Sequence, residues 1–254
     1  MSEKMNPRVP GTLPILNILD NEHPCSYLPD RTATMPLIYP GRAIHEGEFD
    51  HMLAHGIRRS GRFAYFTACE DCQACEPTRL DVNVFRWTDS WRRIVNRGDR
   101  ELSLTISEPH CDPTRLALFN RHREERGLGE GDISYGESDY EGFLVDSCCA
   151  ATYELGYWKD ESLVGASIID CGESSISAVY TYFDPAYGKL SLGTYSILKQ
   201  IQLAKQTQRQ YVYLGMYVAP NRHLSYKSRF LPQQRFIDGE WIDFPAAPAV
   251  AEQV

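Results

Sequence analysis

The stretch SAVYTYFDPAYGKLSLGTYSILKQIQLAKQ, residues 177–206, changes its pattern halfway along. Its first part is rich in β-branched and aromatic residues, which is typical of a strand buried on both faces. This pattern ends at Asp184-Pro185, and a loop that contains glycine follows. From Leu192 onward, apolar side chains recur every three residues, which predicts a helix. The stretch therefore predicts a strand that leads directly into a helix.

The segments around this stretch give an element order. Strands are predicted over residues 152–158, 162–169, 176–183 and 210–218. Three strands, a helix and a further strand form the core order of the acyltransferase fold of acetyl-CoA enzymes. We therefore expect an α+β protein with an acyltransferase-like (GNAT-type) C-terminal domain, residues 111–254. A smaller Cys/Arg-rich N-terminal domain is expected over residues 1–110.

A helix is also predicted at about residues 113–126. Asp112 suits the N-cap position, and Pro113 suits the first position of a helix. Residues 127–142 are rich in glycine and acidic side chains, which predicts a loop.

The composition limits the class of protein. The chain has 254 residues, a net charge of -8 and 43% apolar residues, which is ordinary for a soluble globular protein. It has no run of 18 apolar residues, and its N-terminus does not resemble a secretory signal. We therefore expect a cytoplasmic protein without a membrane segment. The acidic net charge argues against a general nucleic-acid binder, which is usually basic.

Three of the eight cysteines are evenly spaced. Cys69, Cys72 and Cys75 lie three residues apart, and thiolates at such spacing can hold Zn²⁺ or an iron–sulfur cluster. Cys25 is a candidate fourth ligand. The alternative is a group of buried, reduced thiols, because a second CxxC pair is missing.

Residues 185–237 contain no Asp or Glu but have eight Lys or Arg and six Tyr. About seven acids would be expected there by proportion. Cations with aromatic side chains suit a nucleic-acid end, where phosphates meet positive charge and bases stack. The alternative is a solvated helix face with tyrosines in the core.

A second basic group lies near residue 60. Arg58, Arg59 and Arg62 flank Ser60-Gly61, and arginine guanidinium groups can bind phosphate or carboxylate oxygens in pairs. These arginines are candidates for binding an anionic substrate, with an ordinary surface cluster as the alternative.

Several segments together resemble the aminoacyl-tRNA–protein transferases, and most closely their bacterial leucyltransferase branch. The segments are PCSYLPDRTATMPL (24–37), GIRRSGRFAYFTACEDCQACEPTRLDV (56–82), ISAVYTYFDPAYGKLSLGTYSILKQIQLA (176–204), YVYLGMYV (211–218) and LSYKSRFLP (224–232). The resemblance covers most of residues 24–232.

This resemblance implies an enzyme that moves an amino acid, leucine in the first place, from aminoacyl-tRNA to the N-terminal amine of proteins beginning with Asp or Glu. The product is a degradation signal of the N-degron pathway. The ester of the donor is already activated, so the enzyme aligns two substrates, stabilises the oxyanion and accepts a proton. No cofactor is implied for the transfer itself.

Matching positions give the candidate site. The candidate substrate-binding residues are Tyr27, Arg58, Arg59, Ser60, Gly61, Tyr65, Tyr180, Asp184, Gly193, Thr194 and Tyr195. Tyr226 and Lys227 are the candidate catalytic residues. Cys25, Cys69, Cys72 and Cys75 are the candidate metal ligands, because Cys25, Cys72 and Cys75 match cysteines with which eukaryotic relatives bind a metal or cluster.

One segment departs from the family pattern. Where the family has Cys, Lys and Met, this sequence has Asn221, His223 and Leu224, although Tyr226 and Lys227 are kept. The departure lies beside the expected site and leaves leucyl and arginyl transfer both open. A non-catalytic module that binds tRNA or protein N-termini is a further alternative. A CoA-dependent acetyltransferase is disfavoured because the loop lacks the [Q/R]xxGxG/A pattern.

Overall fold

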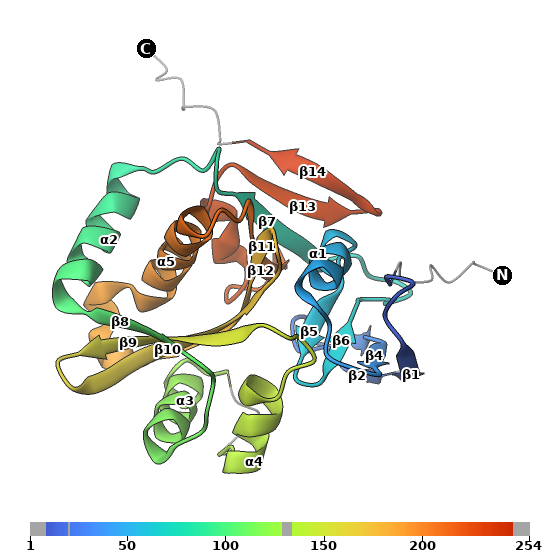
Figure 1. Cartoon of the computed structure of the whole chain (residues 1–254), viewed down its shortest axis with the longest axis horizontal. Helices are drawn as coiled ribbons and strands as arrows, with labels where there is room; N and C mark the ends of the chain where they lie inside the picture. Colours follow the sequence, from blue (N-terminus) through green and yellow to red (C-terminus); the bar gives the residue numbers. More distant parts are fainter. Residues whose placement is uncertain (1–8, 20, 129–133, 246–254) are drawn as a thin grey trace.

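The computed structural model describes residues 9–19, 21–128 and 134–245. Its centre is a mixed eight-stranded sheet with the strand order β14-β13-β7-β12-β11-β10-β9-β8 (Figure 1). The strands are β7 (Glu76–Asp81), β8 (Ser103–Ser107), β9 (Thr152–Lys159), β10 (Ser162–Cys171), β11 (Ser175–Phe183), β12 (Tyr211–Tyr217), β13 (Gln233–Ile237) and β14 (Glu240–Phe244). The four strands predicted from the sequence are confirmed as β9 to β12, with ends shifted by at most two residues.

Helices cover both faces of this sheet (Figure 1). One face carries α2 (Asp89–Glu101) and α5 (Leu192–Gln206), and the other carries α3 (Pro113–Glu125). The predicted helix at 113–126 is confirmed as α3, and the Asp112 carboxylate accepts a hydrogen bond from the Arg115 backbone N–H at 2.8 Å. A short 3₁₀ segment, η2 (Pro185–Leu190), joins β11 to α5.

The loop predicted over residues 127–142 is wrong in its last part. There the chain forms α4 (Glu137–Tyr140) and starts a π-helical turn, η1 (Glu141–Val145). The reason is that Tyr140 and Leu144 are fully buried in a core cluster with Phe119 of α3. Two apolar anchors thus fix a segment whose composition is polar. Residues 129–133 of the same segment lie outside the described residues.

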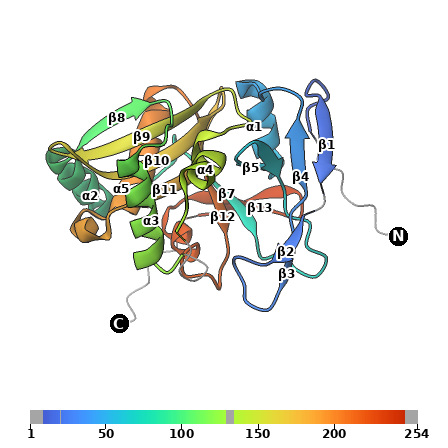
Figure 2. The ribbon, with the colours of Figure 1, turned by 90° about the horizontal axis from the view of Figure 1, so that it is seen from below.

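A smaller four-stranded sheet lies beside the large one (Figures 1 and 2). Its strands, in spatial order, are β1 (Ile15–Leu19), β4 (Leu37–Pro40), β6 (Phe63–Tyr65) and β5 (Arg58–Ser60). The segments between its strands form α1 (Glu46–Ala54) and the hairpin of β2 (Glu22–Pro24) and β3 (Thr32–Thr34). The 3₁₀ turn η3 (Ser225–Arg229) comes much later in the chain. Among the described residues, no helix has the length and apolar character to cross a membrane.

The division of the chain at residue 110 stays a prediction. The large sheet includes β7 and β8, which precede that residue, and the six strands that follow it. β7 lies between β12 and β13, so the segment before residue 110 supplies an interior strand.

Strands β11 and β12 separate shortly after they begin. They pair in parallel only from Ser175 to Ser177 on β11 and from Tyr211 to Tyr213 on β12. Beyond this point β12 pairs with β7 alone, through a register shift next to Gly215, whose φ is +84°. Glycine adopts this left-handed conformation without steric penalty. We call the space between the diverging strands the fork.

A network of hydroxyl groups holds α5 against the sheet. The Ser196 and Ser167 hydroxyl oxygens are 2.6 Å apart, and the Ser167 hydroxyl also contacts those of Tyr157 and Thr181. The Gln200 amide donates to Ser196 from one turn further along the helix. Because these polar groups are almost all inside the core, the network fixes the position of α5 along the strands.

Helix α2 packs very closely on α5. A Cβ atom at Gly98 would overlap the ring of Tyr195, which is 1% exposed. We therefore expect Gly98→Ala to lower the free energy of unfolding by about 1–3 kcal/mol, the usual cost of overpacking a core. Urea denaturation measures this change. A variant as stable as the wild type would show that the two helices can move apart freely.

Candidate functional site

Arg58 occupies the fork. It lies on β5, is 5% exposed, and donates from Nη2 to the backbone carbonyl of Ala178 at 3.3 Å. Ala178 is the first residue of β11 beyond its pairing with β12. The other terminal nitrogen, Nη1, is buried and has no hydrogen-bond acceptor among the described residues. Arg58 therefore keeps one donor free inside the molecule.

Lys227 reaches the fork from the segment that follows β12. It lies in η3, is 6% exposed, and its Nζ donates to the backbone carbonyl of Met216 on β12 at 2.6 Å. A Cβ atom at Gly215 would lie 3.5 Å from Lys227 Nζ and 3.6 Å from Arg58 Nη2. The two cationic groups thus meet at the same glycine.

Arg58 and Lys227 are not held by direct ion pairs in the described structure, although the Asp170 charge acts on Arg58 from a distance. Within residues 9–19, 21–128 and 134–245, no Asp or Glu forms a salt bridge with Arg58 or Lys227. Burial, and then the proximity of Arg58, lowers the pKa of Lys227 to about 7. Burial likewise lowers the pKa of Arg58. Arg58 and the protonated form of Lys227 thus lie together without a salt-bridge partner, an arrangement that suits the binding of an anion.

Tyrosine side chains surround this cation pair. Tyr65 lies opposite Arg58 in the β5–β6 register, and burial raises the pKa of the Tyr65 hydroxyl. The pKa of Tyr27 is also raised, mainly by burial, with contributions from Tyr65 and nearby cysteines and an opposing one from Arg58. The Asn221 amide donates to the Tyr27 backbone carbonyl at 2.9 Å. Asn221, which marks the departure from the family pattern, therefore links the β2–β3 hairpin to the loop after β12.

Arg59 has a different environment from its neighbour. Its Nε donates to the Asp170 carboxylate at 2.7 Å, and the two side chains are 1% and 0% exposed. A second nitrogen donates to the backbone carbonyl of Asp146 at 2.9 Å. Thr152 donates to the other oxygen of Asp170. Arg59 thus joins the β5–β6 hairpin to β10 instead of facing the fork.

Cations and aromatic side chains lie at the mouth of the fork. Tyr226, next to Lys227, is 38% exposed, and its ring centroid is 6.4 Å from that of Phe230. Arg126, just beyond α3, lies over the ring of Phe183 at 5.5 Å. Burial, then Arg222 and Arg126, lower the pKa of His223. Arg126 also opposes the burial that raises the pKa of Tyr226.

The remaining predicted substrate residues occupy several places. Tyr180 lies on β11 against α3, and its buried hydroxyl has no hydrogen-bond partner among the described residues. Asp184 caps η2 and pairs with Arg121 at 2.8 Å. Tyr195 is in the core and donates to Asp99 at 2.8 Å.

The other four flank these residues. Gly193 would contact Phe183 through a Cβ atom, and Thr194 is half-buried on α5. Ser60 and Gly61 form the end of β5 and the turn to β6, where Gly61 has a φ of +55°. The structure therefore brings Tyr27, Arg58, Tyr65 and Lys227 together, whereas Arg59, Asp184 and Tyr195 have buried or local partners of their own.

The four candidate metal ligands lie in the same region. Burial, followed by nearby Cys25, Cys69 and Cys72, raises the pKa of the Cys75 thiol to about 12. The Cys69 sulfur contacts the Thr34 backbone, accepting from its N–H at 3.4 Å. Within the part of the chain that the structure describes, no three Cys, His or acidic side chains are arranged to share a metal ion. Metal binding by these cysteines stays a prediction, and no chemical step below passes through a metal.

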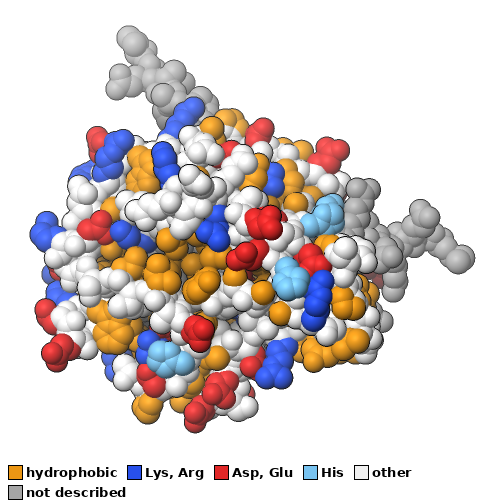
Figure 3. Space-filling view, viewed as in Figure 1, with side chains coloured by type: hydrophobic (Ala, Val, Ile, Leu, Met, Phe, Trp, Pro, Cys, Tyr) orange, Lys and Arg blue, Asp and Glu red, His pale blue; other side chains and the backbone are white. Residues whose placement is uncertain are grey.

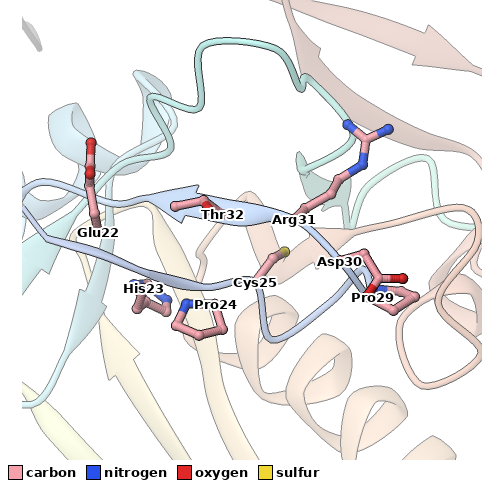
Figure 4. Close-up of a pocket in the computed structure, with 8 residues that line it drawn as sticks. All are labelled: Glu22, His23, Pro24, Cys25, Pro29, Asp30, Arg31 and Thr32. Carbon is pink, nitrogen blue, oxygen red and sulfur yellow. The ribbon is translucent and has the colours of Figure 1, made fainter.

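The β2–β3 hairpin borders a hollow of about 610 Å³ (Figure 4). Cys25 and Arg31 lie on opposite arms; the Cys25 sulfur points between the arms, and the Arg31 guanidinium extends away from them. Arg31 donates to the Asp71 carbonyl at 3.4 Å. The hollow is lined by charges of both signs, Glu22 and Asp30 as well as Arg31, so it lacks the uniform positive charge of the fork.

The basic residues of the acid-free segment 185–237 do not share one cleft. Lys199 pairs with Asp99, Arg235 pairs with Glu76, and Arg229 lies over Trp91 at 5.5 Å. On the face in Figure 3, Lys and Arg side chains alternate with Asp and Glu. Acids from other segments thus pair with part of this segment, and its expected contact with a nucleic-acid end stays a prediction. Lys227, in the last part of the segment, lies near Arg58 at Gly215.

Some site features were not predicted from the sequence. Tyr213 and Gly215 of β12 border the fork, and Arg79 of β7 donates to the Tyr213 hydroxyl at 3.0 Å. A glycine inside a strand pattern is the signal that could have indicated the register shift at Gly215. The place of Arg126 depends on the packing of α3 against β11, which the sequence pattern does not give.

A family model described as "Arginine-tRNA-protein transferase, C terminus" matches residues 114–237, and its N-terminal counterpart matches residues 23–93. An aspartate/glutamate leucyltransferase of Saccharophagus degradans is 35% identical over 223 residues, which are 87% of this chain and 94% of that protein. One of Thiobacillus denitrificans is 35% identical over 241 residues, 93% and 98% of the two chains.

Solved structures give weaker matches. L-PGS from Bacillus licheniformis is 18% identical with a TM-score of 0.43, over 57% of this chain and 45% of that one. FemX is 9% identical with a TM-score of 0.41, over 72% and 63%. At this level, the similarity carries no conclusion about function.

Proposed function

This chain belongs to the arginine-tRNA–protein transferase family and is an aminoacyl-tRNA–protein transferase; from that premise we propose that it transfers leucine to proteins whose N-terminal residue is Asp or Glu. The leucine comes from leucyl-tRNA, as the names of the relatives indicate. The observation that carries the acceptor specificity is the buried, uncompensated cation pair of Arg58 and Lys227. The product enters the N-degron pathway in the cytoplasm.

The fork receives the acidic side chain of the acceptor. A carboxylate between the two cations supplies the missing counterion and accepts from Arg58 Nη1, which has no other acceptor among the described residues. Charge-assisted hydrogen bonds of this kind are roughly twice as strong as neutral ones. A neutral first residue would leave both charges unpaired, so the fork discriminates against it.

The reaction follows from this placement. The α-amine of the acceptor attacks the ester carbonyl carbon of leucyl-tRNA and forms the new amide bond. The ester C–O bond breaks, and the ribose oxygen leaves as a hydroxyl after it takes up a proton. The amine gives up one proton in the same sequence. Alignment of the two substrates supplies a large part of the rate, because both reacting groups are held in place.

Tyr226 and Lys227 act on either side of the reacting centre. The Tyr226 hydroxyl stays protonated because burial raises its pKa, so it donates to the developing oxyanion at the mouth of the fork. Lys227 binds the acceptor carboxylate from within and thereby fixes the direction of the α-amine. Arg126 and Arg222 at the mouth attract the phosphates of the tRNA terminus. The C-terminal part takes a GNAT-type arrangement, supported by the order of β9, β10, β11, α5 and β12 and by the fork.

A transfer assay tests this function. The protein is incubated with leucyl-tRNA or arginyl-tRNA and with peptides that begin with Asp, Glu or Ala. We expect leucine on the Asp and Glu peptides and none on the Ala peptide. If arginine were transferred instead of leucine, the proposed donor would be wrong, and the proposed acceptor site would stand. A lack of transfer from both tRNAs would leave only a binding module.

The pKa of Lys227 predicts a pH-dependent stability. This pKa falls from 10.5 to about 7 on folding, so between these values the unfolded chain binds a proton that the folded chain lacks. Below about pH 7, Lys227 therefore has its full destabilising effect on the fold. This effect disappears as the pH rises towards 10.5. Lys227→Met should stabilise the fold by a few kcal/mol at about pH 6 and much less at about pH 10, since one pKa unit corresponds to about 1.4 kcal/mol.

Urea denaturation over this pH range measures the effect. Lys205→Met at the exposed end of α5 is the control, and its effect should not depend on pH. Equal effects of Lys227→Met at both pH values would contradict the low pKa.

A further inference from the structure

A second positively charged site lies away from the fork. The end of α2, the η2 segment and the β9–β10 turn enclose a cavity of about 290 Å³. Arg97, Lys159 and Lys189 line it, with Glu101 as its acidic residue. The cavity is thus built from three elements that are distant in the sequence.

The cations in this cavity are only partly compensated. Arg97 donates from Nη1 to the Lys189 backbone carbonyl at 2.7 Å, and Lys159 pairs with Glu101 at 3.3 Å. Among the described residues, no carboxylate forms a salt bridge with Arg97 or Lys189. The cavity therefore keeps a net positive charge and is open to an anion from solvent.

An aromatic ring lies beside these cations. Tyr187 is half-buried in the cavity wall, and Lys159 Nζ is 5.9 Å from its ring centroid. Cations next to a flat aromatic surface suit a nucleic-acid strand, whose phosphates pair with the charges while a base or ribose rests on the ring. A simple inorganic anion would need only the cations.

The chain connects this cavity directly to the mouth of the fork. β11 ends at Phe183, which lies under Arg126, and η2 carries the chain from there to Lys189. The η2 segment is kinked at Tyr187, and its residues Ala186, Tyr187, Lys189 and Leu190 line the cavity.

We infer that the cavity of Arg97, Lys159, Lys189 and Tyr187 binds a backbone phosphate of the tRNA acceptor strand. This inference rests on the proposed function, because it assumes that the aminoacyl end lies at the fork. It assigns a ligand to residues that lie outside the acceptor site.

Substitution of Lys189 tests the site, with Lys205 as the matched control. Both are exposed lysines of the acid-free segment, but Lys205 lies at the opposite end of α5. Binding of uncharged tRNA is measured by fluorescence anisotropy over a salt series, and the KM for an Asp-starting peptide is measured separately. We expect Lys189→Gln to weaken tRNA binding about 3- to 10-fold and to reduce the salt slope by about one. Lys189→Glu should weaken binding further, and the peptide KM should stay unchanged.

The outcomes separate this site from the proposed function. If Lys189→Glu binds tRNA as tightly as Lys205→Glu while the wild type transfers leucine, the phosphate site is wrong and the function stands. If the wild type transfers nothing but Lys189→Glu still loses tRNA affinity, the function fails and the nucleic-acid site remains. Binding of CoA that depends on Lys189, without an effect on tRNA, would overturn the assignment to tRNA.

Discussion

Arg58→Met should lower kcat/KM for a Glu-starting peptide by roughly 100-fold or more, because truncating one partner of a buried charge pair usually costs 2–5 kcal/mol. The variant removes Arg58 Nη1, a buried nitrogen without an acceptor among the described residues, and leaves Lys227 alone to bind the acceptor carboxylate. The affinity for tRNA should change little. The fold should be as stable as the wild type or more stable, because an uncompensated buried charge is replaced by an apolar side chain.

Arg62→Met is the matched control for this experiment. Arg62 lies in the turn after β5 and pairs with Asp146 at 2.8 Å, but its side chain is 64% exposed. Its substitution should leave kcat/KM and stability unchanged. If Arg58→Met transferred leucine to Glu and Ala peptides in the wild-type ratio, the fork could not be the acceptor site. Thermal denaturation shows whether a loss of activity comes from unfolding.

Arg59→Met should affect stability instead of catalysis. We expect it to lower the free energy of unfolding by about 3–5 kcal/mol, as expected when one partner of a buried ion pair is removed. The Asp170 carboxylate is 0% exposed and would be left without its counterion. Activity should fall only as far as folded protein is lost. Urea denaturation with a parallel transfer assay separates the two effects.

The double variant Arg59→Met/Asp170→Leu supplies the internal control. With both charges replaced by apolar side chains, most of the lost stability should return, because no buried charge is left unpaired. Failure of the double variant to recover would show that Arg59 acts through its bond to the Asp146 carbonyl instead. Adjacent arginines would thus serve binding and folding respectively.

The sequence predicted the local elements well because their signals are local. The strand pattern at 176–183, the helix from Leu192 and the N-cap at Asp112 each depend on neighbouring residues, and all three are confirmed. The candidate site was predicted through the family resemblance, which pointed to Arg58 and Lys227. Their residue types alone could not show that both are buried without a counterion.

Features that depend on distant contacts were not predicted. Strand β7 pairs with β12 and β13, which begin more than a hundred residues later, and nothing in its own pattern indicates these partners. The different roles of Arg58 and Arg59 depend on Asp170, which is also far along the chain. The partners of the acid-free segment were not predicted for the same reason, since its counterions Asp99 and Glu76 come from other segments.

The hydroxyl network under α5 has a consequence for substrate length. Sliding the helix by one turn, about 5.4 Å, would break the contacts of Ser196 and Gln200 at once. The start of α5, and with it the η2 segment, is therefore held at a fixed distance from the end of β11. If the phosphate site inferred at η2 and the acceptor site proposed at the fork are both occupied, this fixed distance would favour a single-stranded terminus of one length over a shorter or longer one.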